Sequence, residues 1–296
     1  MTLNLEGIFT PIITPFLKEK IAYDLLSYNI SKLSKTGIKG IVVLGSSSES
    51  VFLSNEEKIN ILKKTIQVVP KSMKIIVSSG CESTIETIRL TNIFAKLGVS
   101  TALIITPSYY IGKRKHEVLK KHYFEIADNC DIPIVLYNIP KFTHTNLDVK
   151  IVATLAKHPN IIGIKDSSGD INQLGQYINN TNKDFNVLVG TAGALLGALT
   201  LGCKGGILAL ANLVPEYCVK IFKLIKENKV KEARLLQLRL IPVNQAIIVD
   251  YGISGLKYAM DMLGYHGGDM SLPLPISTIE KKEIKNILMK AKFFEK

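Results

Sequence analysis

One lysine stands where a buried strand is expected to end. The apolar run 161–164 leads directly into Lys165, and Asp166-Ser167-Ser168-Gly169 follows with the composition of a turn. An ammonium group at the mouth of a buried strand loses water, which favours the neutral amine. Because a neutral amine can attack a ketone and form a Schiff base, Lys165 is a candidate nucleophile of a metal-free aldolase. The alternative is a lysine that only marks where a strand meets solvent.

Hydroxyl-bearing residues follow other apolar runs. Gly45-Ser46-Ser47-Ser48-Glu49 comes after one run, and Tyr109, Tyr110 and Tyr137 follow or end two more. A serine-rich turn at a helix start offers hydroxyl and backbone N–H groups to a carboxylate, and a tyrosine can relay protons beside a forming iminium. Taken singly, each is also consistent with a polar loop or a buried aromatic residue whose hydroxyl is hydrogen-bonded. Together they predict one site.

The elements that must position these residues alternate regularly. Apolar strand-like runs are separated by stretches of helical periodicity, as expected for parallel strands joined by helical crossovers. The expected strands are 7–13, 40–44, 74–77, 102–106, 132–137, 161–165, 186–189 and 206–210. The expected helices are 25–33, 54–69, 83–97, 118–127, 147–156, 171–178, 194–200, 215–228, 230–249, 255–263 and 278–294.

Local signals mark several boundaries of these elements. Ser54 with Glu57 has the spacing of a capping box, Ser83 opens a second helix, and Pro70 is expected to stop the first. Gly37, Gly98 and Gly202 each lie between a helical stretch and an apolar run, where glycine closes a helix in the left-handed conformation.

This pattern predicts an α/β fold with a (β/α)8 barrel, since eight strand–helix units are the expected content of such a barrel. A doubly wound open sheet is the alternative. We expect residues 1–228 to form the barrel and residues 229–296 a C-terminal helical segment packed on it. In a barrel, the carboxyl ends of the strands carry the chemistry, which is where the lysine, serines and tyrosines fall.

Composition excludes several classes of function. The chain has 296 residues and a net charge of +12, but its excess charge is lysine, and arginine occurs only at Arg89, Arg114, Arg234 and Arg239. Nucleic-acid readers usually rely on arginine, so we expect no nucleic-acid partner. No apolar run is long enough to span a bilayer, and no signal segment precedes the first strand. The scattered cysteines 81, 130, 203 and 218 lack metal-ligand spacing, so we expect reduced, buried thiols, no metal and a cytoplasmic location.

Three motifs carry a resemblance over essentially the whole chain. The Gly45–Glu49 loop, Tyr137-Asn138-Ile139-Pro140 and Gly163-Ile164-Lys165-Asp166 are similar to those of the dihydrodipicolinate synthase / N-acetylneuraminate lyase family of class I pyruvate-type aldolases. The resemblance implies a barrel with a C-terminal helical segment, usually a homotetramer built as a dimer of dimers, with no cofactor.

The resemblance also implies roles for individual residues. Lys165 corresponds to the Schiff-base lysine, and Tyr137 to a proton-relaying tyrosine that also touches the substrate carboxylate. Ser46 and Ser47 fall on the loop that binds the pyruvate carboxylate, and Ser47 also relays protons.

Further positions follow from the same likeness. Tyr110 corresponds to a tyrosine that reaches across a dimer interface into the neighbour's site, and Gly190 and Ile207 line the pyruvoyl pocket. Independently of the likeness, Ser167 or the loop of His144 is a candidate donor to the far carboxylate of a dicarboxylic substrate.

Within the family, the nearest likeness is to the 4-hydroxy-2-oxoglutarate aldolase branch, through residues 80–84, 165–167, 190–193 and 251–257. It implies cleavage of 4-hydroxy-2-oxoglutarate to pyruvate and glyoxylate. Phe142 stands where the synthases carry an arginine that grips the aldehyde's carboxylate, and a phenyl ring cannot replace a guanidinium. Ser48 stands where a permissive residue such as glycine is common, and His144 where glycine is common.

Other functions stay open at this point. The enzymic alternatives are 4-hydroxy-tetrahydrodipicolinate synthase and a 2-keto-3-deoxy sugar acid aldolase, both of which also use pyruvate chemistry. From another class, a catalytically silent member could bind a keto acid as a sensor. In each case the expected partner is a small 2-oxo acid, with neither nucleic acid nor a membrane.

Overall fold

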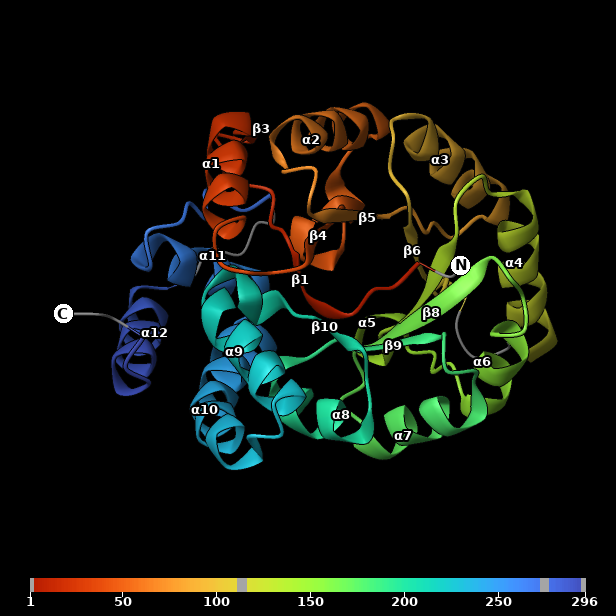
Figure 1. Cartoon of the computed structure of the whole chain (residues 1–296). Helices are drawn as coiled ribbons and strands as arrows, with labels where there is room; N and C mark the ends of the chain where they lie inside the picture. Colours follow the sequence, from red (N-terminus) through yellow and green to blue (C-terminus); the bar gives the residue numbers. More distant parts are fainter. Residues whose placement is uncertain (1–2, 111–115, 272–276, 294–296) are drawn as a thin grey trace. The chain divides into compact units, whose positions relative to one another are not determined.

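Eight parallel strands form a closed barrel in the computed structural model, which describes residues 3–110, 116–271 and 277–293 (Figure 1). The strand order around the barrel is β1-β10-β9-β8-β7-β6-β5-β4. Helices alternate with these strands along the chain, so the predicted (β/α)8 barrel is confirmed and the open sheet is excluded. The strands are β1 (Gly7–Pro11), β4 (Gly40–Val43), β5 (Lys74–Ser78), β6 (Ala102–Ile105), β7 (Ile134–Asn138), β8 (Ile161–Asp166), β9 (Asn186–Val189) and β10 (Gly205–Ile207).

The chain divides into two compact units by the density of its contacts. The first comprises Met1–Gly7 and Lys74–Ile207, and the second Ile8–Met73 and Leu208–Lys296. Each unit is therefore built from segments that are far apart in the sequence.

The first unit contains strands β5 to β10 and the helices between them. Strands β7 and β8 pair in parallel with Tyr137 opposite Lys165 and Asn138 opposite Asp166. Strand β8 is buried at every residue, as its continuous apolar run predicts. The helices are α3 (Thr84–Lys96), α4 (His116–Asn129), α5 (Pro140–Thr143), α6 (Val149–Leu155), α7 (Ile171–Asn180) and α8 (Leu195–Leu201).

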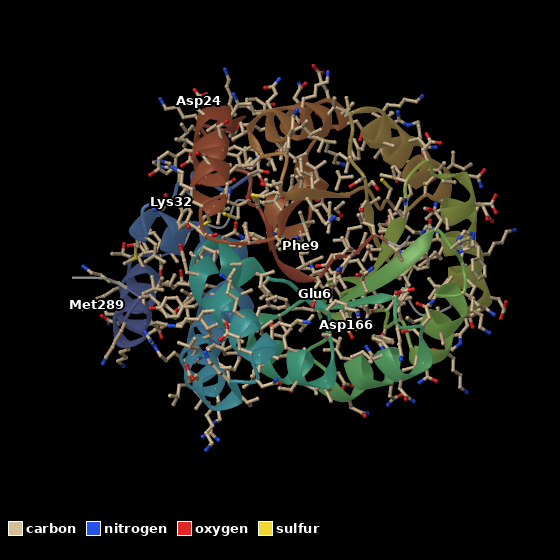
Figure 2. The ribbon with its side chains drawn as sticks, viewed as in Figure 1. Glu6, Phe9, Asp24, Lys32, Asp166 and Met289 are labelled. Carbon is tan, nitrogen blue, oxygen red and sulfur yellow. The ribbon has the colours of Figure 1, made fainter. Side chains whose placement is uncertain are left out.

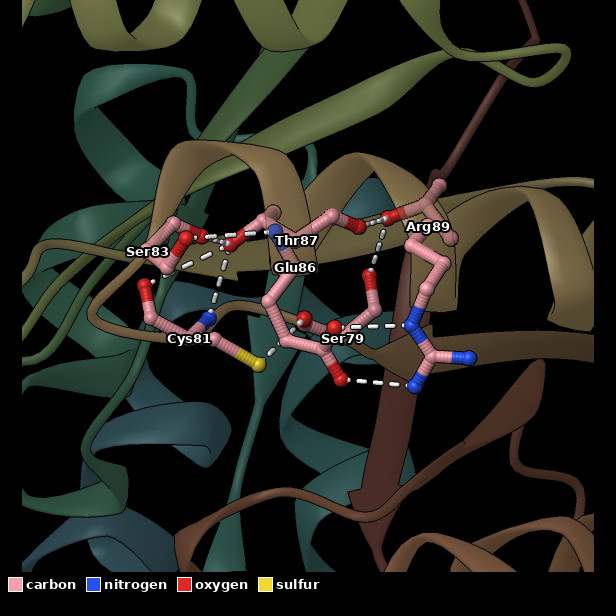
Figure 3. A network of polar contacts seen from close by, with 7 residues as sticks. Ser79, Cys81, Ser83, Glu86, Thr87 and Arg89 are labelled. Atoms are coloured by element: carbon pink, nitrogen blue, oxygen red, sulfur yellow. Dashed lines mark hydrogen bonds and ion pairs between the residues drawn. The ribbon is translucent and has the colours of Figure 1, made fainter.

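Helix α3 begins as its sequence predicts (Figure 3). The Ser83 hydroxyl accepts a hydrogen bond from the backbone N–H of Glu86 at 3.3 Å, which caps the helix. Thr87 accepts from the Cys81 N–H at 2.9 Å and so fixes the preceding loop. On the exposed face, Arg89 donates two hydrogen bonds of 2.7 Å to the Glu86 carboxylate.

The second unit contains the paired strands β1 and β4 and six α-helices among its described residues. These helices are α1 (Tyr23–Leu33), α2 (Asn55–Val68), α9 (Pro215–Lys226), α10 (Val230–Val243), α11 (Gly252–Met262) and α12 (Thr278–Lys290). Ser54 and Glu57 form the predicted capping box of α2, which ends before Pro70. Phe9 on β1 is buried, whereas Asp24 on α1 and Met289 on α12 are exposed (Figure 2).

Two parts of the second unit differ from the sequence-based expectation. The helix expected over 230–249 ends at Val243, and Asn244–Asp250 form a π-helix. Pro242 lies just before this change, and its nitrogen has no hydrogen to donate to the preceding turn. The sequence reading also missed a small hairpin of β2 (Phe16–Leu17) and β3 (Lys20–Ile21). None of the described helices has the length and apolar character needed to cross a membrane.

Candidate functional site

Lys165 lies at the end of β8 with its ammonium over the ring of Tyr137. The distance from Lys165 Nζ to the ring centroid is 3.9 Å, and only 5% of Lys165 and 3% of Tyr137 are exposed. The pair follows from the parallel register, because Tyr137 and Lys165 are direct neighbours on adjacent strands. The predicted buried lysine is therefore confirmed in its position. The ring under its ammonium belongs to the tyrosine for which the family resemblance implies proton relay.

Ser167 and Gly190 lie against each other next to this pair. The Ser167 N–H donates to the Asn138 carbonyl at 2.9 Å, and the Gly190 N–H donates to the Asp166 carbonyl at 2.7 Å. A Cβ atom at Gly190 would lie 2.9 Å from Ser167 Cα, so only glycine allows this close approach. The structure thus brings Lys165, Tyr137, Ser167 and Gly190 together.

Ile207 ends β10 and is fully buried. Its neighbour Gly206 pairs with Val189, the residue before Gly190, so Ile207 and Gly190 occupy the ends of adjacent strands. The lining of one pocket by both residues stays a prediction.

A buried amide network behind Lys165 was missed by the sequence reading. Asp166 is fully buried, and its carboxylate accepts from Ser168 N at 2.7 Å, Gln173 Nε2 at 2.9 Å and Asn138 Nδ2 at 3.2 Å. Asn146 joins the network through Asn138 and Gln173. The only signal was the alternation of the strand, which directs Asp166 away from the side that Lys165 faces.

The serine loop belongs to the second unit. Ser46–Ser48 form a single 3-10 turn directly after β4, with Ser47 at 7% exposure and Ser48 at 1%. Ser48 Oγ donates to the Ile12 carbonyl at 2.6 Å, and Thr14 Oγ1 donates to the Ser48 carbonyl at 2.9 Å. Ser48 therefore holds the turn in place through its side chain and its backbone.

A permissive residue at position 48 would suit a positive φ, but the left-handed backbone of this loop lies at other positions. Ser48 is not among the residues with positive φ, whereas Leu44 has φ 61° and Glu49 φ 56°. These two left-handed residues lie on either side of Gly45–Ser48. The serine is tolerated because the turn places the unusual backbone conformation on its neighbours.

Glu49 and Lys257 form a buried ion pair that sequence reasoning also missed. Their Oε1 and Nζ atoms are 2.5 Å apart, and neither residue is more than 3% exposed. Removal from water lowers the pKa of Lys257, and the carboxylate of Glu49 opposes that shift. A lysine near the chain's end and a glutamate near its start give no local signal of such a contact.

Other residues named from the sequence are exposed within this single chain. Tyr110 is 79% exposed and its ring meets that of Tyr109 edge-on, with centroids 5.2 Å apart. Phe142 lies on α5 and is 54% exposed, and His144 follows in a left-handed conformation with φ 48°. Cys81 and Cys130 are half-buried, so the expectation of four buried thiols holds only for Cys203 and Cys218.

The polar groups at the loop after β8 and at the loop after β4 are of the kinds that bind an organic acid. They are an amine, hydroxyls and backbone N–H groups, the donors that a carboxylate and a ketone accept. In the ranges that the structure describes, no group of three or more histidine, cysteine or carboxylate side chains could hold a metal ion.

A family model provides the wider context for this arrangement. The model of the dihydrodipicolinate synthetase family matches residues 4–291. The chain belongs to this family. Its enzymes are class I aldolases and lyases that form a Schiff base on a lysine, and this chain is an enzyme of that class.

Individual relatives within the dihydrodipicolinate synthetase family cover nearly the full chain. A 4-hydroxy-tetrahydrodipicolinate synthase of Methanoculleus marisnigri is 36% identical over 289 residues, which are 96% of this chain and 98% of that protein. A protein of the same name from Thermodesulfovibrio yellowstonii is 35% identical over 287 residues, with 97% and 98% covered. A chloride-inhibited dihydrodipicolinate synthase of Acinetobacter baumannii, solved in complex with pyruvate, is 29% identical. It superimposes with a TM-score of 0.93 over 98% of this chain and 100% of its own.

Proposed function

We propose that the chain forms a Schiff base between Lys165 and pyruvate and joins the resulting enamine to an aldehyde. The observation that carries this proposal is the buried Lys165 at the carboxyl end of β8, 3.9 Å from the centroid of the Tyr137 ring. Strand ends at this face are where barrel enzymes place their chemistry. A structural relative in complex with pyruvate supports the choice of keto acid.

The chemistry follows from the amine. The neutral Lys165 attacks the C2 ketone of pyruvate, and loss of water leaves a protonated imine. The imine withdraws electrons from C3, so a proton leaves C3 and an enamine forms. The enamine carbon then attacks the aldehyde carbon of the second substrate, and the aldehyde oxygen takes up a proton to become a hydroxyl. Water, or an amino group of the joined aldehyde, then attacks the imine carbon, and this attack displaces the amine of Lys165 and releases the product.

Tyr137 and the serine loop are assigned supporting roles in this scheme. Tyr137 relays protons to and from the reacting atoms and contacts the substrate carboxylate, and Tyr110 contributes to the relay. Ser46 and Ser47 bind the pyruvate carboxylate, and Ser47 also relays protons. Gly190 and Ile207 line the pocket around the pyruvoyl group, with Ser167 beside them.

For the second substrate, the comparisons favour the synthase reading, which the sequence analysis placed second. Both relatives described above carry the name 4-hydroxy-tetrahydrodipicolinate synthase, at 36% and 35% identity over nearly the whole chain. We therefore propose that the enzyme condenses pyruvate with aspartate semialdehyde to form 4-hydroxy-tetrahydrodipicolinate.

One residue keeps 4-hydroxy-2-oxoglutarate cleavage as a second candidate. Phe142 occupies the position of the expected arginine, and a charge-assisted contact of that kind is worth about 1.5–3 kcal/mol. Without it, the aldehyde's carboxylate has to be bound by other donors, among which Ser167 and the loop of His144 are candidates. Cleavage of 4-hydroxy-2-oxoglutarate gives pyruvate and glyoxylate through the reverse of the same steps.

The assembly and the location are part of the proposal. The exposed rings of Tyr109 and Tyr110 and the exposed Ile85 line one cavity of the first unit, which supports contact with another copy of the chain. We propose a cytoplasmic homotetramer built as a dimer of dimers. Sedimentation velocity of the wild type and of Tyr110→Ser tests the assembly, and a wild-type monomer at working concentration contradicts it.

Reductive trapping tests the chemistry directly. Incubation with pyruvate and borohydride should add one reduced pyruvyl group per chain at Lys165, because only an amine forms the trapped imine. Lys165→Ala should abolish the adduct, and the matched variant Lys157→Ala, at an exposed position, should retain it. An adduct on a different lysine contradicts the proposal, and no adduct in the wild type favours the keto-acid sensor.

A kinetic comparison decides the second substrate. The synthase proposal expects the larger kcat/KM with pyruvate and aspartate semialdehyde, and the aldolase proposal expects it with 4-hydroxy-2-oxoglutarate. Phe142→Arg should raise kcat/KM for aspartate semialdehyde by about ten-fold or more relative to the hydroxy-oxo acid, since it restores a charge-assisted contact. A ten-fold wild-type preference for 4-hydroxy-2-oxoglutarate overturns the synthase assignment.

A further inference from the structure

The turn that carries Ser46 and Ser47 is held between two residues in an unfavourable backbone conformation. Leu44, before the turn, has φ 61°, and Glu49, after it, has φ 56°. Left-handed backbone is disfavoured for residues that carry a Cβ atom, and it persists where surrounding contacts determine it. The loop therefore needs an anchor outside itself.

Glu49 provides that anchor through three contacts with the C-terminal part of the chain. Its Oε1 atom lies 2.5 Å from Lys257 Nζ on α11. Its Oε2 atom accepts from Ser271 N at 3.0 Å and from Ser271 Oγ at 2.5 Å. Ser271 is 222 positions away along the chain, so this carboxylate ties the loop to a distant segment.

Lys257 is held equally tightly on its own side. It is 2% exposed, its Nζ donates to the Asp269 carbonyl at 2.7 Å, and it lies 4.8 Å from the centroid of the Phe16 ring. A Cβ atom at Gly267 would lie 2.7 Å from Lys257 Cα, so glycine lets the segment 267–271 approach α11 closely. This approach lets the Asp269 carbonyl accept a hydrogen bond from Lys257 and lets Ser271 donate to Glu49.

Ser46 and Ser47 are not used in this anchoring. Within the described residues of the second unit, Ser48 makes the turn's side-chain hydrogen bond, to Ile12, and no hydrogen bond joins the hydroxyls of Ser46 or Ser47 to a neighbour. Ser48 and Glu49 thus hold the loop against other parts of the chain, and the two serines before them remain available to a ligand.

We propose that Glu49 and Lys257 are positioning residues that hold the Ser46–Ser48 turn in the geometry that binds the carboxylate of the 2-oxo acid. This inference rests on the proposed function and extends its carboxylate site to the C-terminal helical segment. Both side chains are almost completely buried. Their effect passes through the backbone of the turn, because Glu49 is the residue that ends it.

The test measures the pyruvate concentration that gives half-maximal trapping by borohydride, together with the adduct at saturation. This readout needs no aldehyde. Ser271→Ala removes one donor to Glu49 and should raise the half-saturating concentration about three-fold, and Glu49→Gln should raise it about ten-fold or more. Because Lys165 is untouched, saturating pyruvate should still give one adduct per chain in both variants.

A double variant separates positioning from stability. Glu49→Gln leaves the ammonium of Lys257 buried without its counter-charge, which destabilises the fold. Adding Lys257→Met removes that charge, so the melting temperature should recover while the half-saturating concentration stays raised. The control Arg239→Met removes hydrogen bonds to Ala291 within the same C-terminal segment and should lower the melting temperature without changing the half-saturating concentration.

Each failure has its own meaning. If Ser271→Ala, Glu49→Gln and the double variant bind pyruvate as the wild type does, the positioning role is overturned. Recovery of the half-saturating concentration together with the melting temperature also overturns it. If Glu49→Gln does not fold, Ser271→Ala still decides. Absence of the adduct in the wild type defeats the proposed function instead.

Discussion

The loop after β8 and the loop after β4 are each organised by one buried carboxylate, but the two carboxylates have different partners. Among the described residues, the Asp166 carboxylate accepts hydrogen bonds from uncharged donors on Ser168, Gln173 and Asn138, none more than 28 positions away along the chain. Glu49 faces the ammonium of Lys257 and the N–H and hydroxyl of Ser271.

The difference teaches how the two loops depend on the rest of the chain. Amide donors from the end of β7, from the loop after β8 and from α7 satisfy Asp166 locally, so the lysine loop needs little beyond the elements beside it. An ion pair removed from water is costly to break, since the remaining charge is left unpaired. The serine loop therefore depends on the C-terminal segment. We expect substitutions near Lys165 to act on the chemical step and those near Ser47 to act on binding.

The largest effect expected from this comparison is the loss of catalysis in the variant Tyr137→Phe. Loss of the proton-relaying hydroxyl should reduce kcat by about 10²–10⁴-fold, the usual range for general acid–base catalysis. Tyr123→Phe is a matched control, because it removes a buried hydroxyl in the same unit that contacts Thr106. Steady-state kinetics measures kcat for both variants, and an equal loss in both would contradict a specific role of the Tyr137 hydroxyl in catalysis.

Ser47→Ala should act on binding. A hydrogen bond to a charged carboxylate is worth about 1.5–3 kcal/mol, so the half-saturating pyruvate concentration in trapping should rise about ten- to a hundred-fold. Ser34→Ala, which loses a hydroxyl bonded to the Ile30 carbonyl on α1, is the control. A fall in the adduct formed at saturation, with unchanged half-saturation, would place Ser47 with the chemical residues instead.

Asp166→Asn should lower stability. An asparagine presents one N–H₂ group to a site made only of donors, so at least one hydrogen bond is lost at a cost of about 1–3 kcal/mol. Asp170→Asn is the matched control, since Asp170 caps α7 and asparagine caps as well as aspartate does. Urea unfolding measures both variants, and equal stabilities would show that the network around Asp166 adds nothing.

The smallest expected effect is a loss of stability at alkaline pH, caused by one buried thiol in each unit. Burial raises the pKa of Cys203 and of Cys218 to about 12, from an ordinary 9.0. Above pH 9 the unfolded chain loses these protons first, so the free energy of unfolding should fall, by at most about 1.4 kcal/mol per pH unit for each thiol.

The pKa shift of Lys257 changes the free energy of unfolding with pH in the opposite direction. Because burial lowers the pKa of Lys257 in the folded chain, the unfolded chain holds the proton longer, and stability rises with pH just below the ordinary value of 10.5.

The prediction for the thiols is tested by urea unfolding at pH 8.5 and 10. The fall in the free energy of unfolding between these pH values should be smaller for Cys203→Ala and Cys218→Ala than for the wild type. Equal slopes in all three proteins would contradict the role of the thiols.

Much of the fold could be predicted because its signals are local. Continuous apolar runs marked the buried strands, Ser54 and Ser83 marked two helix starts, and the helix-ending glycines adopt the expected left-handed conformation, with φ 83° at Gly37 and 106° at Gly202. The lysine at the end of β8 was visible for the same reason. These features depend on residues a few positions apart, so they can be read from the chain itself.

Only the tertiary structure decided which distant residues meet. It turned Tyr137 and Lys165 into direct neighbours through strand register, and it joined Glu49 to Lys257 and Ser271. It also placed the left-handed backbone on Leu44 and Glu49 instead of Ser48. The physical reason is that a buried ion pair or a strained turn persists only where the surrounding packing and hydrogen bonds fix its geometry. Those conditions arise when segments from both ends of the chain come together.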